Sequence, residues 1–169
     1  MLKFLAESRG AFDSLDPNDK LRLMNQESNI LTDDSKVADL LAETKTIAVL
    51  GIKPETHSMQ PAFYVPKYMQ DRGFKIVPVP VYYPEVTEIL GEPVVRKVSE
   101  IEGGIDMVNV FRKPADIPQH VEDIIAARPR SVWFQLGIEN NEAAAAFAAA
   151  GIKVVQNRCL LVEHRSLAR

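Results

Sequence analysis

The chain has 169 residues, of which 46% are hydrophobic and 25% charged, and its formal net charge is -3. This length and balance predict one globular domain with a hydrophobic core. The slightly acidic charge argues against the basic surface that nucleic acid or an anionic membrane requires. No apolar run reaches the length of a membrane span, and the single cysteine, Cys159, is typical of a reducing compartment. We therefore expect a cytoplasmic protein that binds neither nucleic acid nor membranes.

Residues 1–35 differ from the rest of the chain. They are polar, lack a sustained hydrophobic period, and contain the stretch DSLDPNDK, which favours turns over a core element. We interpret them as a polar N-terminal extension, solvated or loosely docked, with a dimer arm or a partner-binding segment as alternatives. The domain proper is expected to span residues 36–169. Thr32 or Asp33 is a favourable N-cap for its first helix, whose apolar positions begin at Val37.

In the predicted domain, short apolar runs alternate with helical patterns. Helices are expected from about residue 62 to residue 72, over 116–127, and after the N-cap Asn140. Strands separated by helices indicate βαβ units, hence a Rossmann-like α/β fold with a mostly parallel sheet flanked by helices. The predicted strands are TIAVLG (46–51), FKIVPVP (74–80), IDMVNVF (105–111), SVWFQL (131–136) and IKVVQ (152–156).

Ligands of parallel α/β sheets bind beyond the carboxyl ends of the strands, so the residues that follow each strand are the candidate site. After the first strand come Gly51, which permits a tight turn, the cation Lys53, and Ser58 near the coming helix N-terminus, which favours anions. After the strand 105–111 come Arg112 and Lys113. Two adjacent cations at this place suit a phosphate or a carboxylate.

The later strands add to the same edge. Gln135 offers an amide and Gly137 allows close approach of the backbone, while Arg158 follows the last strand with a further cation. Several basic groups that converge on one edge of an acidic protein predict a phosphate-bearing nucleotide cofactor. Coenzyme A (CoA) fits best, since it carries a pyrophosphate and a ribose phosphate.

The usual dinucleotide fingerprint is missing. Lys53 and Thr56 stand where GxGxxG requires glycines, and Asp71 falls before the end of a helix rather than at the end of the second strand. An oxidoreductase that uses NAD is therefore disfavoured. One that uses NADP is disfavoured less strongly, because the cations at the strand ends can accept the extra phosphate of NADP. Two further alternatives are a redox-sensing Rossmann protein and a purely structural domain. The acidic charge and an N-terminal region too short for a DNA-binding domain argue against the redox sensor.

The sequence offers few candidates for catalysis. Cys159 and His164 are five residues apart and would not share a helix face, and the three histidines show no metal-ligand spacing. Glu163 and Asp106 are isolated carboxylates, without a partner that would divide acid from base. We predict no metal site and infer no reaction.

From about Val37 onward the chain resembles the small stand-alone CoA-binding proteins, relatives of the N-terminal domain of the succinyl-CoA synthetase alpha subunit. The resemblance implies a Rossmann-like domain that binds CoA or an acyl-CoA. It also implies a non-catalytic carrier, sensor or regulatory module, since the synthetase's phosphohistidine belongs to a separate domain. The matching stretches are TIAVLG, PAFYVPKYMQDRGFKIVPV, EILGEPV, DMVNVFRKP, SVWFQLGI and NRCLLVEH.

The resemblance also implies which positions contact CoA. Two departures put contacts in question, because Val79-Pro80-Val81 replaces the usual VNP, and Asn157-Arg158-Cys159 replaces the usual DRC. The apolar edge strands and the N-terminal extension add the expectation of a homodimer. The implied CoA-binding residues are Gly51, Ile52, Lys53, Pro54, Ser58, Val79, Pro80, Phe111, Arg112, Lys113, Gln135 and Gly137.

Overall fold

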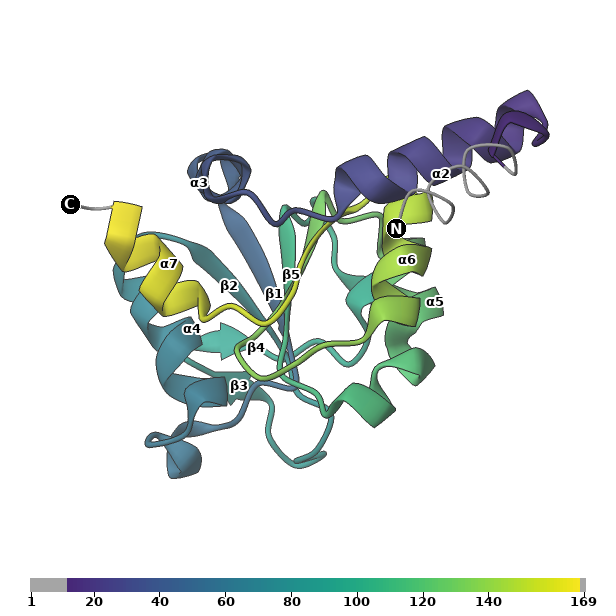
Figure 1. Cartoon of the computed structure of the whole chain (residues 1–169). Coiled ribbons are helices and arrows are strands. Elements are labelled where there is room, and N and C mark those ends of the chain that lie inside the picture. The colour runs from purple at the N-terminus through teal and green to yellow at the C-terminus, as the bar shows by residue number, and fades with distance from the viewer. Residues whose placement is uncertain (1–11, 168–169) are drawn as a thin grey trace.

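A five-stranded parallel sheet forms the centre of the molecule in the computed structural model, which describes residues 12–167 (Figure 1). The strand order is β2-β1-β5-β6-β7, with every pairing parallel, which confirms the predicted Rossmann-like α/β fold. The chain runs from β1 outward to β2 and returns to β5 on the other side of β1, so the order reverses between β1 and β5. The strands are β1 (Thr46–Leu50), β2 (Lys75–Val79), β5 (Met107–Val110), β6 (Ser131–Phe134) and β7 (Lys153–Val155).

Helices cover both faces of this sheet, and alternate strand residues point to the two layers. On β1, Ile47 and Val49 join the core beneath α3, α4 and α7, whereas Ala48 and Leu50 join the core beneath α5 and α6. Burial on both faces explains why these strands read as continuous apolar runs. The helices of the two layers are α3 (Asp34–Glu43), α4 (Pro61–Asp71) and α7 (Leu160–Leu167) on one face, and α5 (Val121–Ala127) and α6 (Asn141–Ala149) on the other.

The predicted helix caps are confirmed at two places. The side chain of Asp33 accepts the backbone N–H groups of Ser35 and Lys36 at the start of α3. Asn140 accepts the N–H of Ala143 at 2.9 Å at the start of α6. Each cap satisfies a backbone donor that has no partner inside the helix, which is why these residue types mark helix starts.

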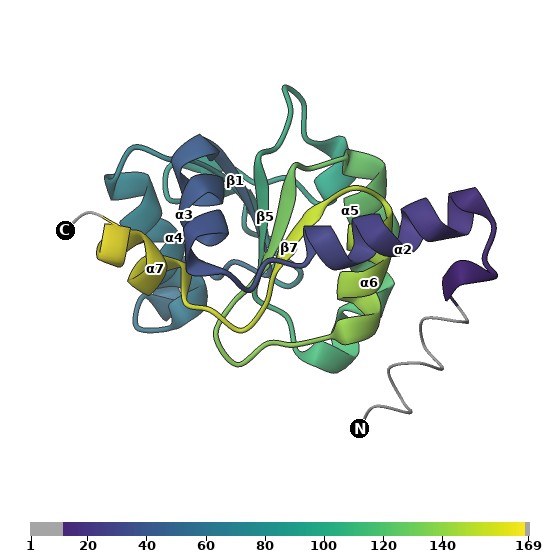
Figure 2. The ribbon, with the colours of Figure 1, turned by 45° about the horizontal axis from the view of Figure 1, so that its top comes forward.

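The stretch DSLDPNDK forms a turn at Ser14 and Leu15, as predicted, but its second half begins a helix that was not predicted. Asp16 caps α2 (Pro17–Asn29) by accepting the N–H groups of Asn18 and Asp19, and Pro17 takes the first helical position. Turn formers such as Asp and Pro also start helices, which explains the error. No residue of α2 is buried, and the helix lies against α6 (Figure 2).

Two further segments depart from the predicted elements. The helix expected from residue 116 begins at Val121, because Pro118, which has no N–H, divides the preceding residues into two 3-10 turns, Pro114–Asp116 and Pro118–His120. A short antiparallel hairpin, β3 (Glu88–Ile89) with β4 (Glu92–Pro93), follows β2. None of the helices in residues 12–167 is both long and apolar enough to cross a bilayer.

Candidate functional site

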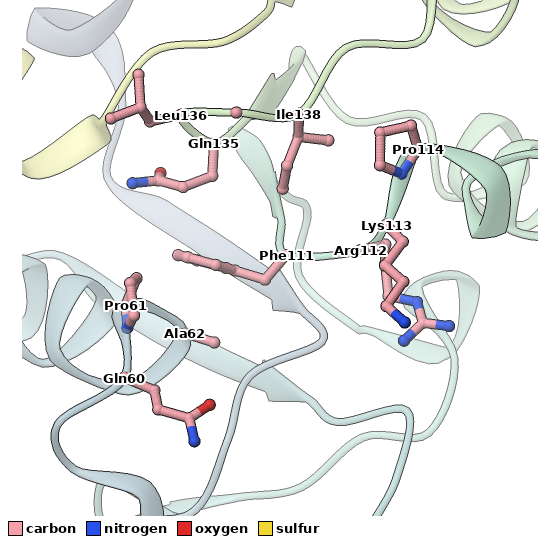
Figure 3. A pocket seen from close by; sticks show the side chains of 11 residues that line it. Gln60, Pro61, Ala62, Phe111, Arg112, Lys113, Pro114, Gln135, Leu136 and Ile138 are labelled. Atoms are coloured by element: carbon pink, nitrogen blue, oxygen red, sulfur yellow. The ribbon is translucent and has the colours of Figure 1, made fainter.

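A cleft of about 370 Å³ lies at the carboxyl ends of β5 and β6, beside the place where the strand order reverses (Figure 3). Parallel α/β sheets bind their ligands at such a place, because the loops on either side of it diverge. Three segments form its walls: the start of α4, the residues after β5, and the residues after β6. They contribute residues 60–62, 111–114 and 135–138.

Gly51 brings three strand ends together at this edge. Its φ is +86°, and a Cβ atom there would stand 2.3 Å from the carbonyl oxygen of Phe111. The Gly51 N–H donates to the carbonyl of Val79, and the Phe111 N–H donates to the carbonyl of Leu50, both at 2.9 Å. Only glycine fits this position, since any side chain would collide with the backbone that enters the cleft.

The loop between β1 and α4 is fixed by an interruption in the helix. Pro66 lies inside α4 and has no N–H, so the carbonyl of Ala62 loses its partner within the helix. The backbone N–H of Lys53 donates to that carbonyl at 3.2 Å. The Lys53 ammonium donates to the side chain of Gln60, which lies in the cleft wall. Lys53 therefore borders the cleft without lining it.

Arg112 is the most unusual group of the cleft. Its side chain is only 8% exposed, yet within residues 12–167 its one carboxylate contact is Asp116, with Nη2 and Oδ2 3.4 Å apart. The guanidinium carbon lies 5.3 Å from the ring centroid of Tyr82, and Nε is buried without a hydrogen-bond partner among residues 12–167. Buried guanidinium groups normally engage most of their five N–H donors. The charge of Arg112 is therefore poorly satisfied by the protein itself.

His120 lies close enough to Arg112 to feel its charge. Burial, followed by the positive charge of Arg112, lowers the pKa of His120, while Asp123 and Asp116 act in the opposite direction. Its Nε2 atom is buried without a partner in the described part of the chain. Because the ordinary pKa of histidine is about 6.5, the lowered value makes this side chain neutral at pH 7.

The residues after β6 form the opposite wall. Gln135 is 4% exposed, and its Oε1 accepts the N–H of Leu160 at 3.3 Å, so its Nε2 is the end that remains to donate. The side chains of Gln135 and Phe111 extend in the same direction, and Ile138 points toward Phe111 (Figure 3). The N–H of Gly137 donates to Oδ1 of Asn157 at 2.7 Å, which fixes the backbone of this wall.

The loop after β2 reaches toward both Arg112 and the β1–α4 loop. Tyr82 covers the Arg112 guanidinium, and the Tyr83 hydroxyl lies 3.3 Å from Nε2 of His57. The guanidinium of Arg96 donates to three carbonyls of this loop, those of Tyr83, Pro84 and Val86. An arginine with three carbonyl acceptors holds the loop in one conformation, even though Tyr83 has a left-handed φ of 65°.

The structure divides the predicted site residues into three groups. Phe111, Arg112, Lys113, Gln135 and Gly137 line the cleft together. Gly51, Lys53 and the buried side chains of Ile52, Pro54, Val79 and Pro80 shape the neighbouring strand ends and loops. Ser58 is exposed and ends a 3-10 turn, whereas Gln60 occupies the N-cap position of α4.

Arg158 follows β7 at the predicted edge, but it does not line the cleft with Arg112 and Lys113, so the prediction that it adds a free cation to the site was wrong. Its Nη1 lies 2.7 Å from Oδ1 of Asp34 and 3.5 Å from Oε1 of Glu163, and its Nη2 donates to the carbonyl of Thr32. The hydrogen bond with Asp34 raises the pKa of Arg158, assisted by Glu163. This arginine ties the segment before α3 to the end of β7.

Sequence reasoning missed the part of the site that does not follow a strand. The start of α4 and Tyr82 approach the strand ends only through the fold. Leu136 and Ile138, which flank the predicted Gly137, were also not predicted to line the cleft. The stretch QPAF at residues 60–63 was the available signal, because proline favours the first helical position. No group of three or more His, Cys, Asp or Glu side chains within residues 12–167 is arranged to hold a metal ion.

The fold defines a Rossmann-like α/β domain with a cleft at the carboxyl ends of its strands. The family described as the CoA binding domain matches residues 45–165, and the chain belongs to this family. An uncharacterized protein of Bacillus subtilis, YneT, is 34% identical over 132 residues, which are 77% of this chain and 93% of the relative.

Solved structures extend these similarities. A Thermus thermophilus protein is 37% identical with a TM-score of 0.73, over 80% of this chain and 99% of its own. A hypothetical protein from Pyrococcus horikoshii is 32% identical with a TM-score of 0.73, over 81% of this chain and 93% of its own. An acetyl-coenzyme A synthetase of Ca. Korarchaeum cryptofilum shares the fold at 16% identity and a TM-score of 0.57, over 69% of this chain and 27% of its own.

Proposed function

We propose that the cleft binds CoA or an acyl-CoA, with Arg112 as the central phosphate contact, and that the protein acts as a non-catalytic carrier, sensor or regulatory module. The observation that carries this proposal is the state of Arg112, a nearly buried guanidinium with one long carboxylate contact and an unpartnered Nε. Membership of the CoA binding domain family supports CoA as the source of the phosphate.

A phosphate supplies what Arg112 lacks. Its oxygens accept two parallel N–H bonds from one edge of a guanidinium, and such charge-assisted pairs are about twice as strong as neutral hydrogen bonds. The exposed Lys113 lies next in the chain and lines the same cleft, so a second cation stands beside the first. CoA carries several phosphate groups, which is the kind of ligand that adjacent cations suit.

The side chains around the cleft are groups that hold a ligand. They comprise two cations, the amides of Gln60 and Gln135, and apolar residues such as Phe111 and Ile138. Cations and amides bind the phosphates and amides of a cofactor, and the apolar surface excludes water around it. This composition supports binding as the purpose of the site.

The residues at the end of β2 argue against the alternative ligand, a nicotinamide dinucleotide. Its adenosine ribose is usually held by an acidic residue at the end of the second strand, where this chain has the buried Val79 and Pro80. The loop that follows them instead places Tyr82 over Arg112. NADP remains the nicotinamide cofactor to test, since Arg112 could accept its extra phosphate.

Isothermal titration of the full chain with CoA, acetyl-CoA, NAD and NADP at one fixed salt concentration tests the proposal. We expect CoA and its ester to bind and NAD not to bind. Arg112→Met should weaken CoA binding by roughly 10- to 100-fold, the range for a charged hydrogen bond. Arg130→Met is the matched control, because Arg130 is 57% exposed and pairs with Glu43 away from the cleft. Binding of NADP alone, or of none of these ligands, would overturn the proposal.

A further inference from the structure

The cleft has two chemically different halves. Arg112 and Lys113 lie together on one side, and Phe111 and Gln135 extend toward the other, where Pro61 and Ala62 begin α4 (Figure 3). The charged side chains that line the cleft are therefore confined to one half, and the other half is apolar apart from the amides of Gln60 and Gln135. A ligand that matches both halves carries phosphate at one end and an uncharged, largely apolar group at the other.

Gln135 is oriented so that it presents a donor. Its Oε1 is occupied by the N–H of Leu160, and its Nε2 makes no hydrogen bond with another residue of the described chain. The side chain is only 4% exposed but lines the cleft, so its unpaired donor is open to a ligand that carries an acceptor. A thioester carbonyl is such an acceptor, whereas the thiol of free CoA accepts hydrogen bonds only weakly.

The size of the cleft limits the group that enters it. Its volume of about 370 Å³ is near the low end of small-molecule sites, which span roughly 300–1,000 Å³, so a ligand whose phosphate lies at Arg112 leaves little room in the cleft for its acyl group. Leu136 stands at the rim with 66% of its side chain exposed, an apolar surface that a bound acyl group would cover. Size and lining together fit a short aliphatic chain.

We infer that the preferred ligand is a short-chain acyl-CoA rather than free CoA, an inference that rests on the proposed CoA site. Ile138 and Phe111 contact the acyl group, and the amide of Gln135 donates to the thioester carbonyl. The two contacts make separate contributions. The apolar contact increases with each methylene, and the Gln135 contact distinguishes any ester from the free thiol.

Titration of the full chain with CoA, acetyl-CoA, butyryl-CoA and palmitoyl-CoA tests this inference. We expect acetyl-CoA to bind more tightly than CoA, and the affinity to rise about four-fold per added methylene up to butyryl-CoA. Palmitoyl-CoA should gain little beyond butyryl-CoA, because the cleft is too small for its chain. A gain that continued to palmitoyl-CoA at the same increment would overturn the short-chain preference.

Two variants assign the preference to the residues. Gln135→Glu keeps an acceptor for the Leu160 N–H but replaces the donor with a carboxylate oxygen, so it should abolish the ester preference. Ile138→Ala should reduce the gain in affinity per methylene, because it removes apolar surface from the cleft wall. Ile125→Ala is its control, since Ile125 is also half-buried against the same core but belongs to α5 outside the cleft.

The failure of this inference differs from the failure of the proposed function. Equal affinity for CoA and butyryl-CoA, or a preference that neither variant changes, overturns the inference and leaves CoA binding intact. Absence of binding by CoA and by all its esters overturns both. Each variant is measured beside its unfolding transition, so that loss of the fold is not read as loss of the contact.

Discussion

Two arginines of this protein follow buried strands at the same edge of the sheet, and their surroundings differ completely. Arg158, after β7, is 22% exposed and contacts the carboxylates of Asp34 and Glu163 and the carbonyl of Thr32. Arg112, after β5, is more deeply buried. In the described part of the chain it has one carboxylate, 3.4 Å away, and its Nε has no hydrogen-bond partner. Pairing, more than position at a strand end, separates a structural cation from one available to a ligand.

The partners of Arg158 show that the edge strand β7 and the centre of the sheet differ in how their cations are used. Asp34 and Thr32 precede residue 45, where the match to the CoA binding domain family begins. Nearby, Ile30 pairs with Val154 on the outer edge of β7. The residues after β7 therefore anchor the N-terminal segment, whereas Arg112, after β5, is left with unused hydrogen-bond donors.

The largest effect is expected from the glycine that shapes the Arg112 region. Gly51→Ala forces a Cβ into the Phe111 carbonyl, and we expect a loss of about 3 kcal/mol or more in the free energy of unfolding. Gly73→Ala is the control, since Gly73 also has a positive φ but nothing within 4 Å of an added Cβ, and it should lose about 1–2 kcal/mol. Urea denaturation measures both. Equal losses would show that the backbone of Phe111 yields.

The second effect separates the arginines by stability. Arg158→Met removes two ion pairs and a carbonyl contact, so the free energy of unfolding should fall by about 1 kcal/mol. Arg112→Met replaces a poorly paired buried charge with an apolar side chain of similar length, and stability should hold or rise. Denaturation of both variants without ligand measures the two changes in the free energy of unfolding. Equal losses of stability would show that the two arginines do not differ in their structural role.

The same two variants should behave in reverse toward the ligand. Arg158→Met should bind CoA within about two-fold of the unaltered protein, because Arg158 does not line the cleft. This result would sharpen the contrast with the large loss expected for Arg112→Met. A comparable loss in Arg158→Met would mean that the β7 end belongs to the site after all. Titration calorimetry at one salt concentration provides the comparison.

The smallest effect concerns pH. Burial lowers the pKa values of His120 and His164, with Arg112 and Arg72 adding to the effect respectively. The unfolded chain therefore binds more protons than the native state just below pH 6.5, and stability falls as the pH drops through this range. CoA should reduce the contribution of His120 to this pH dependence of stability, because its phosphate offsets the charge of Arg112. The contribution of His164 should not change. Denaturation of His120→Gln and His164→Gln at pH 5.5 and 7.5, with and without CoA, measures both parts.

The central sheet was predictable because its strands are short apolar runs that are buried on both faces. TIAVLG and SVWFQL needed no knowledge of their neighbours to be assigned, and Asp33 and Asn140 marked helix starts through local capping. The order of βα units then placed residues 111–113 and 135–137 at one edge. These parts of the fold depend on interactions near in sequence or on the general geometry of parallel sheets.

What could not be predicted depends on contacts distant in sequence. Arg158 pairs with Asp34 across 124 positions, and nothing near Arg158 announces that its charge is used. Tyr82 meets Arg112 only because the loop after β2 turns back toward β5. The helix α2 was not predicted, because its N-cap Asp16 and its first residue Pro17 are residue types that favour both turns and helix starts.

The proline inside α4 has a consequence for the dynamics of the site. Because the Lys53 N–H takes the carbonyl that Pro66 leaves free, a loop amide is built into the hydrogen bonding of a helix. Hydrogen exchange at Lys53 therefore requires the bond between this loop and the first turn of α4 to break. We expect the loop and that turn to be coupled through this bond, so that the wall beside the cleft is protected as one unit.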